Sequence, residues 1–118
     1  MRVSKNKINA HLQKEITKVL HQAIADLKSP EEVEQFLRSF LSESEYATLA
    51  KRVAIAYWLD RGRSYENINQ NLKVSSATIS AIQSNMKTPG VKTTLQKIKA
   101  EEWATQWADR IQKFIKRN

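Results

Sequence analysis

The 118-residue sequence contains no cysteine, which excludes disulfide bonds and thiolate metal sites. Its two glycines and two prolines leave little material for the turns of a β-sheet. No apolar run approaches the roughly 20 residues that span a bilayer. Residues 1–11 also lack the apolar middle of a signal peptide. We therefore expect a soluble, cytoplasmic protein that is mostly helical.

The sequence also lacks the residue patterns of enzymes and metal sites. It has no nucleophile elbow, phosphate-binding loop, HExxH pair or cluster of carboxylates outside a helix start. The glutamates of residues 31–34 have a sufficient role at such a start, where acidic groups favour the helix dipole. His11 and His21 have no evident ligand partners. We predict a protein that is not an enzyme and that binds neither a cofactor nor a metal ion.

Positive charge is what the sequence has in excess. Its 20 lysines and arginines stand against 12 acidic residues, which gives a net charge of +8. The excess lies mainly in residues 1–28 and 91–118, whereas residues 29–62 carry more acidic than basic side chains. Such a balance suits nucleic acid, because lysine and arginine release the counterions condensed on its phosphates. Charge alone permits this function without specifying it.

Apolar residues recur at helical spacing along most of the chain. An amphipathic helix of about five turns is predicted over residues 8–27. Ser29, followed by a proline and a glutamate, predicts the start of a second helix, and a capping box at Ser42 predicts a third. Gly62 is a plausible end for the third helix. There is no internal repeat or long linker, so we predict one all-helical domain over residues 1–118.

A break at residues 88–90 precedes a last predicted helix, which carries apolar residues from Val91 to Phe114 and a basic opposite face. Trp103 and Trp107 lie on its apolar side. Large aromatics at helical spacing usually belong to a core or a dimer interface. They are also typical anchors of a partner-binding surface. An alternative function is therefore a helical protein–protein interaction module that uses the Trp103/Trp107 face.

Residues 64–86 have the spacing of a helix-turn-helix, in which two short helices clasp each other around a tight turn. Ser64 and Ser75 are well placed to cap the two helices. The turn position that glycine often occupies is Lys73, which must adopt a left-handed backbone at a cost of roughly 1 kcal/mol. An ordinary helical hairpin has the same spacing. The apolar residues occur only where the two helices would meet, at Ile68, Leu72, Val74, Ile79 and Ile82.

Two sequence blocks are more specific than this spacing. Residues 41–62 read LSESEYATLAKRVAIAYWLDRG and residues 75–80 read SSATIS. In this order and spacing they resemble the Trp repressor family, in its capped helix ending in Arg-Gly and in the start of its recognition helix. The similarity extends over residues 30–89. It implies an all-α, Trp repressor-like domain with a helix-turn-helix, whose N- and C-terminal helices interlock in an intertwined homodimer.

The resemblance implies a sequence-specific regulator of transcription, acting as a repressor on double-stranded DNA. Two reading heads would enter successive major grooves of a roughly palindromic operator. Carried over by position, the base-facing residues are small or polar: Ser76, Ala77, Ser80 and Asn69. Five basic residues are candidates for phosphate contacts, each with a plain alternative as a solvated charge: Arg52, Arg61, Arg63, Lys73 and Lys87.

In the family, two arginines hold the corepressor tryptophan, and a small residue follows the second arginine. Arg52 matches the first arginine, but Ala81 stands at the second position and Ile82 replaces the small residue. We therefore predict a regulator that does not respond to tryptophan, because one guanidinium is missing and a larger side chain fills the space. Ser42 matches a hydroxyl of the family's pocket, yet capping explains it without a ligand. No residue pattern in the sequence indicates another small effector.

Overall fold

The computed structural model describes residues 8–117, and its description of side chains leaves out residues 107–108 and 112–117. Within this range the chain forms six α-helices and no strand, which confirms the all-α prediction. They are α1 (Ala10–Ala25), α2 (Pro30–Phe40), α3 (Glu43–Asp60), α4 (Tyr65–Leu72), α5 (Ser76–Ser84) and α6 (Pro89–Arg117). The chain divides into two compact units, Met1–Tyr46 and Ala47–Asn118, with the boundary inside α3. A single domain over residues 1–118 stays a prediction.

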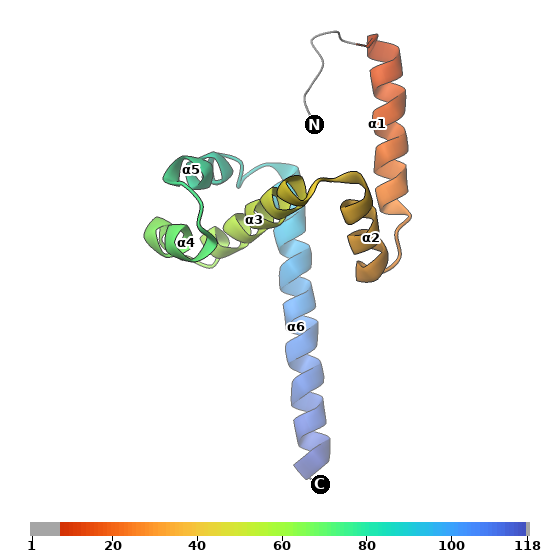
Figure 1. Cartoon of the computed structure of the whole chain (residues 1–118). Helices are drawn as coiled ribbons and strands as arrows, with labels where there is room; N and C mark the ends of the chain where they lie inside the picture. Colours follow the sequence, from red (N-terminus) through yellow and green to blue (C-terminus); the bar gives the residue numbers. More distant parts are fainter. Residues whose placement is uncertain (1–7, 118) are drawn as a thin grey trace. The chain divides into compact units, whose positions relative to one another are not determined.

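The first unit holds α1 and α2 (Figure 1), and polar side chains cap the start of each helix. Asn9 caps α1 by accepting a backbone N–H of the first turn at 2.8 Å, and Asp26 follows its last residue. The helix is therefore shorter than the predicted range of residues 8–27. Ser29 caps α2, and Pro30 occupies its first turn, as predicted. None of the described residues 8–46 is buried, so the apolar stripe of α1 lies on the surface of this unit.

Both ends of α3 have the predicted signals. The backbone N–H of Glu45 donates to Ser42 Oγ at 3.1 Å, and Glu45 Oε1 accepts the N–H of Ser42 at 2.8 Å. The bond from the Ser42 backbone first, and the bond with the Ser42 side chain second, stabilise the charged carboxylate and lower the pKa of Glu45. After α3, Gly62 has φ +84°, and the N–H groups of Gly62 and Arg63 bond to carbonyls of the last helical turn. This is a Schellman motif, which needs a left-handed residue where glycine is least strained.

In the second unit, α3, α4 and α5 pack around three fully buried isoleucines, one from each helix: Ile55, Ile68 and Ile79. Partly buried apolar side chains surround them, namely Trp58, Leu59, Leu72, Val74 and Ile82. The five apolar residues predicted to clasp the helical pair all belong to this cluster. The core of the second unit therefore holds α4 and α5 in place.

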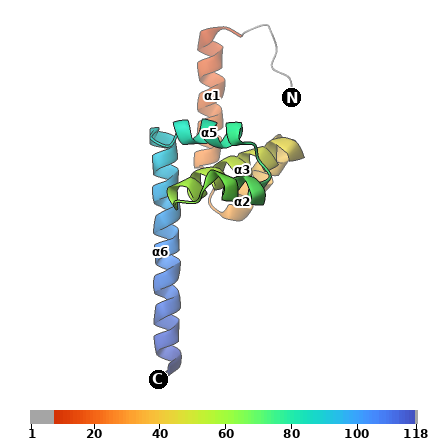
Figure 2. The same ribbon diagram turned by 90° about the vertical axis from the view of Figure 1, so that its left-hand side faces the viewer.

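The last helix begins inside the segment predicted as a break. Pro89 and Gly90 form the first turn of α6, because a proline at this position has no N–H that the helix needs. The break lies instead in the turns of residues 85–88. Figures 1 and 2 both show the far half of α6 extending beyond α3, α4 and α5. Among the described side chains of α6, those that contact the rest of the unit include Leu95, Lys99 and Glu102 in its first half.

Candidate nucleic-acid interface

A tight turn joins α4 to α5. Lys73 adopts the left-handed conformation (φ 57°, ψ 48°), and its N–H donates to the carbonyl of Asn69 at 3.0 Å. The side-chain amide of Asn69 donates to the carbonyl of Val74, which closes the turn from the other side. Ser75 then caps α5 by accepting the N–H of Thr78 at 3.1 Å. The strain at Lys73 is thus offset by bonds and packing on both sides of the turn.

Burial decides which face of α5 is available to a partner. Ile79 is 0% exposed and packs against the buried isoleucines of α3 and α4. Three of the predicted base-facing residues, Ser76, Ala77 and Ser80, are exposed at the start of this helix. The fourth, Asn69, is also exposed, but its amide group is engaged within the turn. The capped N-terminus of α5 therefore presents small side chains to solvent.

The helical pair is held by α3 through residues that periodicity does not single out. Apolar residues occupy nearly every position from Val53 to Leu59, so no single stripe stands out. A helix that is apolar all round is covered on more than one side. Here Ile55 and Leu59 face the core with α4 and α5, while Val53 and Ala56 line a pocket beside α6. Ile55 is an anchor of the site that only the tertiary structure reveals.

Arg63 stands in the link between α3 and α4, directly before the cap of α4. Its guanidinium carbon lies 4.0 Å from the centroid of the Trp58 ring. One of its N–H groups also donates to Asn67 Oδ1 at 3.3 Å. Both partners are neutral, so they hold the side chain without compensating its charge. The other predicted phosphate contacts of this unit are exposed as well, namely Arg52, Lys73 and Lys87.

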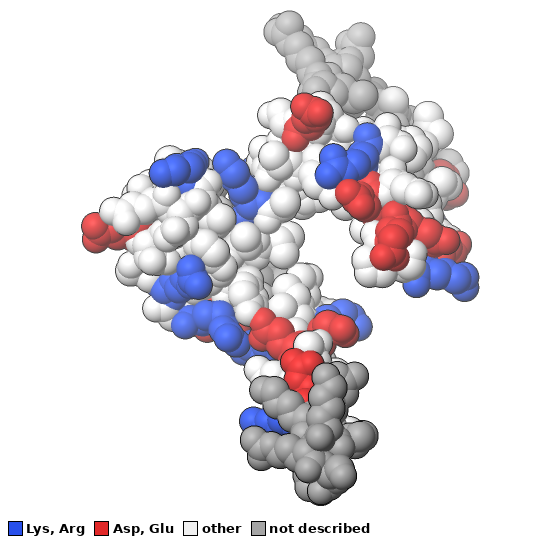
Figure 3. Space-filling view, turned by 60° about the horizontal axis from the view of Figure 1, so that its bottom comes forward, with Lys and Arg blue, Asp and Glu red and all other residues white. Residues whose placement is uncertain are grey.

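Arg61 is part of a polar contact between α3 and α6. Arg61 Nη1 lies 3.2 Å from Glu102 Oε2, and the hydroxyl of Tyr57 donates to the other carboxylate oxygen. One turn earlier on α6, Lys99 Nζ lies 2.9 Å from Asp60 Oδ2. Figure 3 shows acidic and basic side chains side by side where the described surface of α6 gives way to grey atoms. The hydrogen bond to Glu102, with a smaller contribution from desolvation, raises the pKa of Tyr57.

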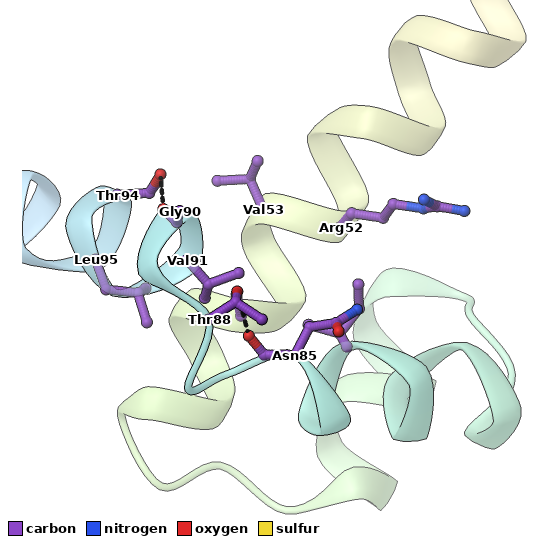
Figure 4. Close-up of a pocket in the computed structure, with 10 residues that line it drawn as sticks. Arg52, Val53, Asn85, Thr88, Gly90, Val91, Thr94 and Leu95 are labelled. Atoms are coloured by element: carbon purple, nitrogen blue, oxygen red, sulfur yellow. Dashed lines mark hydrogen bonds between the residues drawn. The ribbon is translucent and has the colours of Figure 1, made fainter.

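A pocket of about 300 Å³ lies between α3, the end of α5 and the start of α6 (Figure 4). Its walls are mostly apolar and include Val53, Ile82, Val91 and Leu95. Ile82 forms part of the wall. That its side chain fills the space of a bound tryptophan stays a prediction. Arg52 borders the pocket, but its side chain points away from the α6 residues in Figure 4.

Outside this interface, the described residues bear on the predicted partner-binding face, on membrane spans and on metal sites. Trp103 is 63% exposed, whereas the side chain of Trp107, the second residue of the predicted partner-binding face, lies outside the described residues. The described helices include none with the length and apolar composition that crossing a membrane requires. Residues 8–117 also hold no group of three acidic or histidine side chains that could bind a metal ion.

Comparison with known proteins identifies the family of the chain. The sequence model of the family described as Trp repressor protein matches residues 15–99, which span α2 to α5 and parts of α1 and α6. No curated protein and no solved structure matches the chain. Since the match covers well over half of the sequence, the chain belongs to the Trp repressor family, whose members are DNA-binding transcriptional regulators rather than enzymes.

Proposed function

We propose that the chain is a sequence-specific repressor that reads double-stranded DNA through a helix-turn-helix formed by α4 and α5. The observation that carries this proposal is the start of α5, where Ser76, Ala77 and Ser80 are exposed while Ile79 is buried behind them. Serine hydroxyls bond to base edges directly or through ordered water, and an alanine methyl can contact the methyl group of thymine. Asn69 completes the proposed base-facing set.

The proposed phosphate contacts lie around this reading head. Arg61 and Arg63 flank Gly62 immediately before α4, and Lys73 sits in the turn between the two helices. Arg52 on α3 and Lys87 after α5 are exposed. Contacts of this kind fix the register of a protein on the duplex and contribute most of the salt dependence of binding.

We also propose that the regulator works as a homodimer on a roughly palindromic operator. The apolar side chains of α1 are 46% to 70% exposed: Leu12, Ile16, Val19, Leu20 and Ile24. Covering apolar area releases roughly 25 cal/mol for each Å² removed from water, so a continuous stripe of this kind favours association. A second copy is the simplest partner, and two-fold symmetry places two reading heads on successive turns of the duplex.

Tryptophan is not the effector in this proposal. Ala81 is exposed and carries no guanidinium, so a bound indole would lack one of the two arginines that the family uses. Arg52 points away from the pocket residues of α6, as seen in Figure 4. We expect the affinity for DNA to be the same with and without tryptophan.

The direct test is selection of bound sequences from a random duplex library, with and without tryptophan, followed by titration of the selected duplex. A palindromic consensus, weaker binding at higher salt and no effect of tryptophan are expected. Ser80→Glu places a carboxylate against the groove and should abolish binding without unfolding the protein. Gln96→Glu, an equal charge change at an exposed position of α6, is the control. Equal binding by Ser80→Glu and the control would exclude α5 as the recognition helix.

The exposure of Trp103 favours a second candidate, a partner-binding surface on α6. A variant that retains only Trp103, with Trp58→Phe and Trp107→Phe, reports on this surface. Blue-shifted emission that iodide cannot quench in the isolated protein would place Trp103 in an interface between copies. Quenchable emission that becomes protected only with a partner protein would support the second function.

A further inference from the structure

Glu102 lies just beyond the part of the chain that matches the family, which ends at residue 99. It is nevertheless built into the second unit, because both of its carboxylate oxygens have partners on α3 or directly after it. One oxygen accepts the hydroxyl of Tyr57, and the other lies 3.2 Å from Arg61 Nη1. The neighbouring pair of Lys99 and Asp60, at 2.9 Å, joins the same two helices. The extension of α6, meaning its residues beyond 99, thus places the carboxylate of Glu102 next to Arg61, which lies just before α4.

The pair lies at the surface, so another anion can reach it. The side chain of Arg61 is 53% exposed and that of Glu102 is 34% exposed. Exposed ion pairs are weak and open readily, since water and salt screen the attraction. A phosphate and a carboxylate make the same kind of charge-assisted bonds to a guanidinium, so only one of them can use the same N–H groups.

Arg63 offers a contrast within the same link. Its described partners, the ring of Trp58 and the amide oxygen of Asn67, carry no charge. Its full positive charge therefore remains for a phosphate, whereas the charge of Arg61 is compensated. Two arginines with the same predicted role differ in what they can contribute.

We propose that Glu102 competes with a DNA phosphate for Arg61, so that the extension of α6 lowers the affinity of the reading head for DNA. The inference rests on the proposed function, because it needs the chain to bind duplex DNA. It adds an affinity-setting residue outside the reading head, held on a helix that makes no proposed contact with the bases.

The test is a titration of the full-length protein with the selected operator duplex at several salt concentrations. Glu102→Gln should tighten binding about two- to fivefold for each copy of the chain on the DNA, the range that corresponds to one exposed ion pair. The slope of log affinity against log salt should steepen by up to about 0.9 for each additional phosphate that the protein neutralises. Glu101→Gln removes the same charge at the adjacent, exposed position and should have a smaller effect.

Removing the arginine separates competition from general charge effects. Arg61→Ala should weaken DNA binding by the parent less than it weakens DNA binding by Glu102→Gln, because in the parent the guanidinium is partly engaged by Glu102. In the Glu102→Gln background the same substitution should remove the whole increase in affinity. Glu102→Asp keeps the charge but shortens its reach, so it should also tighten binding. If Glu102→Gln has a lower Tm than the parent, Glu102→Asp provides a second test of the competition.

Two results would overturn the inference alone: equal affinities for Glu102→Gln and Glu101→Gln, or a loss of affinity from Arg61→Ala that is as large in the parent as in Glu102→Gln. In both cases the proteins still bind the duplex, so the proposed function stands. If the parent and all variants fail to bind any selected duplex, the proposed function is wrong and the inference falls with it.

Discussion

Ile79→Ala is expected to destabilise the unit of residues 47–118 strongly while leaving the exposed chemistry of α5 unchanged. Ile79 is 0% exposed and packs in a core with only two other fully buried isoleucines. Truncating a buried isoleucine to alanine costs about 2–5 kcal/mol, because the lost transfer free energy adds to that of the cavity. The better helix propensity of alanine returns less than about 0.7 kcal/mol. The cavity therefore dominates the balance.

A milder variant separates stability from recognition. Ile79→Val should cost about 0.5–1.5 kcal/mol. Each kcal/mol lowers the Tm of a small domain by about 4–8 °C. Well below its Tm, Ile79→Val should bind the operator duplex as the parent does. Ser80→Ala, at the exposed neighbouring position, should change the stability by less than about 0.5 kcal/mol. Urea and thermal unfolding followed by circular dichroism measure both changes.

This reasoning is refuted if the loss of stability is not larger at Ile79 than at the neighbouring Ser80. If Ile79→Ala costs no more than Ser80→Ala, then α5 does not turn its isoleucine to the core. The residues that flank Ile79 on the helix would then face inward instead of outward. The proposed base-facing set would fail together with the packing, since one rotation of α5 decides both.

Three further predictions concern the caps and the contact with α6. Lys73→Gly should raise the Tm, because glycine relieves up to about 1 kcal/mol of left-handed strain, and a lower Tm would show that the lysine side chain packs favourably. The pKa of Glu45 is lowered in the folded state, so the stability from its capping box is complete above the ordinary value of 4.5 and is lost as the pH falls below it. The free energy of unfolding should therefore fall less with decreasing pH in Glu45→Gln than in the parent, and an equal fall would contradict the capping role. The pKa of Tyr57 is raised above its ordinary value of 10.0 mainly by its bond to Glu102, so Glu102→Gln should move the absorbance titration of this tyrosine to lower pH. Tyr57→Phe identifies the signal of Tyr57, and an unchanged titration curve in Glu102→Gln would count against the contact.

Features that depend on neighbouring residues could be predicted from the sequence. Ser29, Ser42, Ser64 and Ser75 all cap helices in the structure, because each needs only a backbone N–H two or three residues ahead. The left-handed turn at Lys73 could be predicted for the same reason, since the lengths of α4 and α5 fix where the chain must reverse. The family match over residues 15–99 confirms the resemblance to the Trp repressor family that rests on residues 41–62 and 75–80.

Features that depend on distant residues could not be predicted. Tyr57 and Glu102 are separated by 45 positions, and no local pattern pairs them. Ile55 is hidden for another reason, because α3 is apolar on two faces and periodicity cannot rank positions on such a helix. The start of α6 at Pro89 is a third case, in which proline reads equally well as a breaker and as a first-turn residue.

Arg61 and Arg63 show why charge counted from a sequence differs from charge that a ligand can use. Both contribute to the net charge of +8, and both stand beside the same glycine. Arg61 pairs with the carboxylate of Glu102 on α6, while Arg63 contacts the ring of Trp58 and the side-chain amide of Asn67. If Glu102 competes with DNA for Arg61, as proposed, the number of phosphates that the chain neutralises depends on a tertiary contact made far along the sequence. The salt dependence of DNA binding measures that number directly, whereas the net charge of a sequence does not.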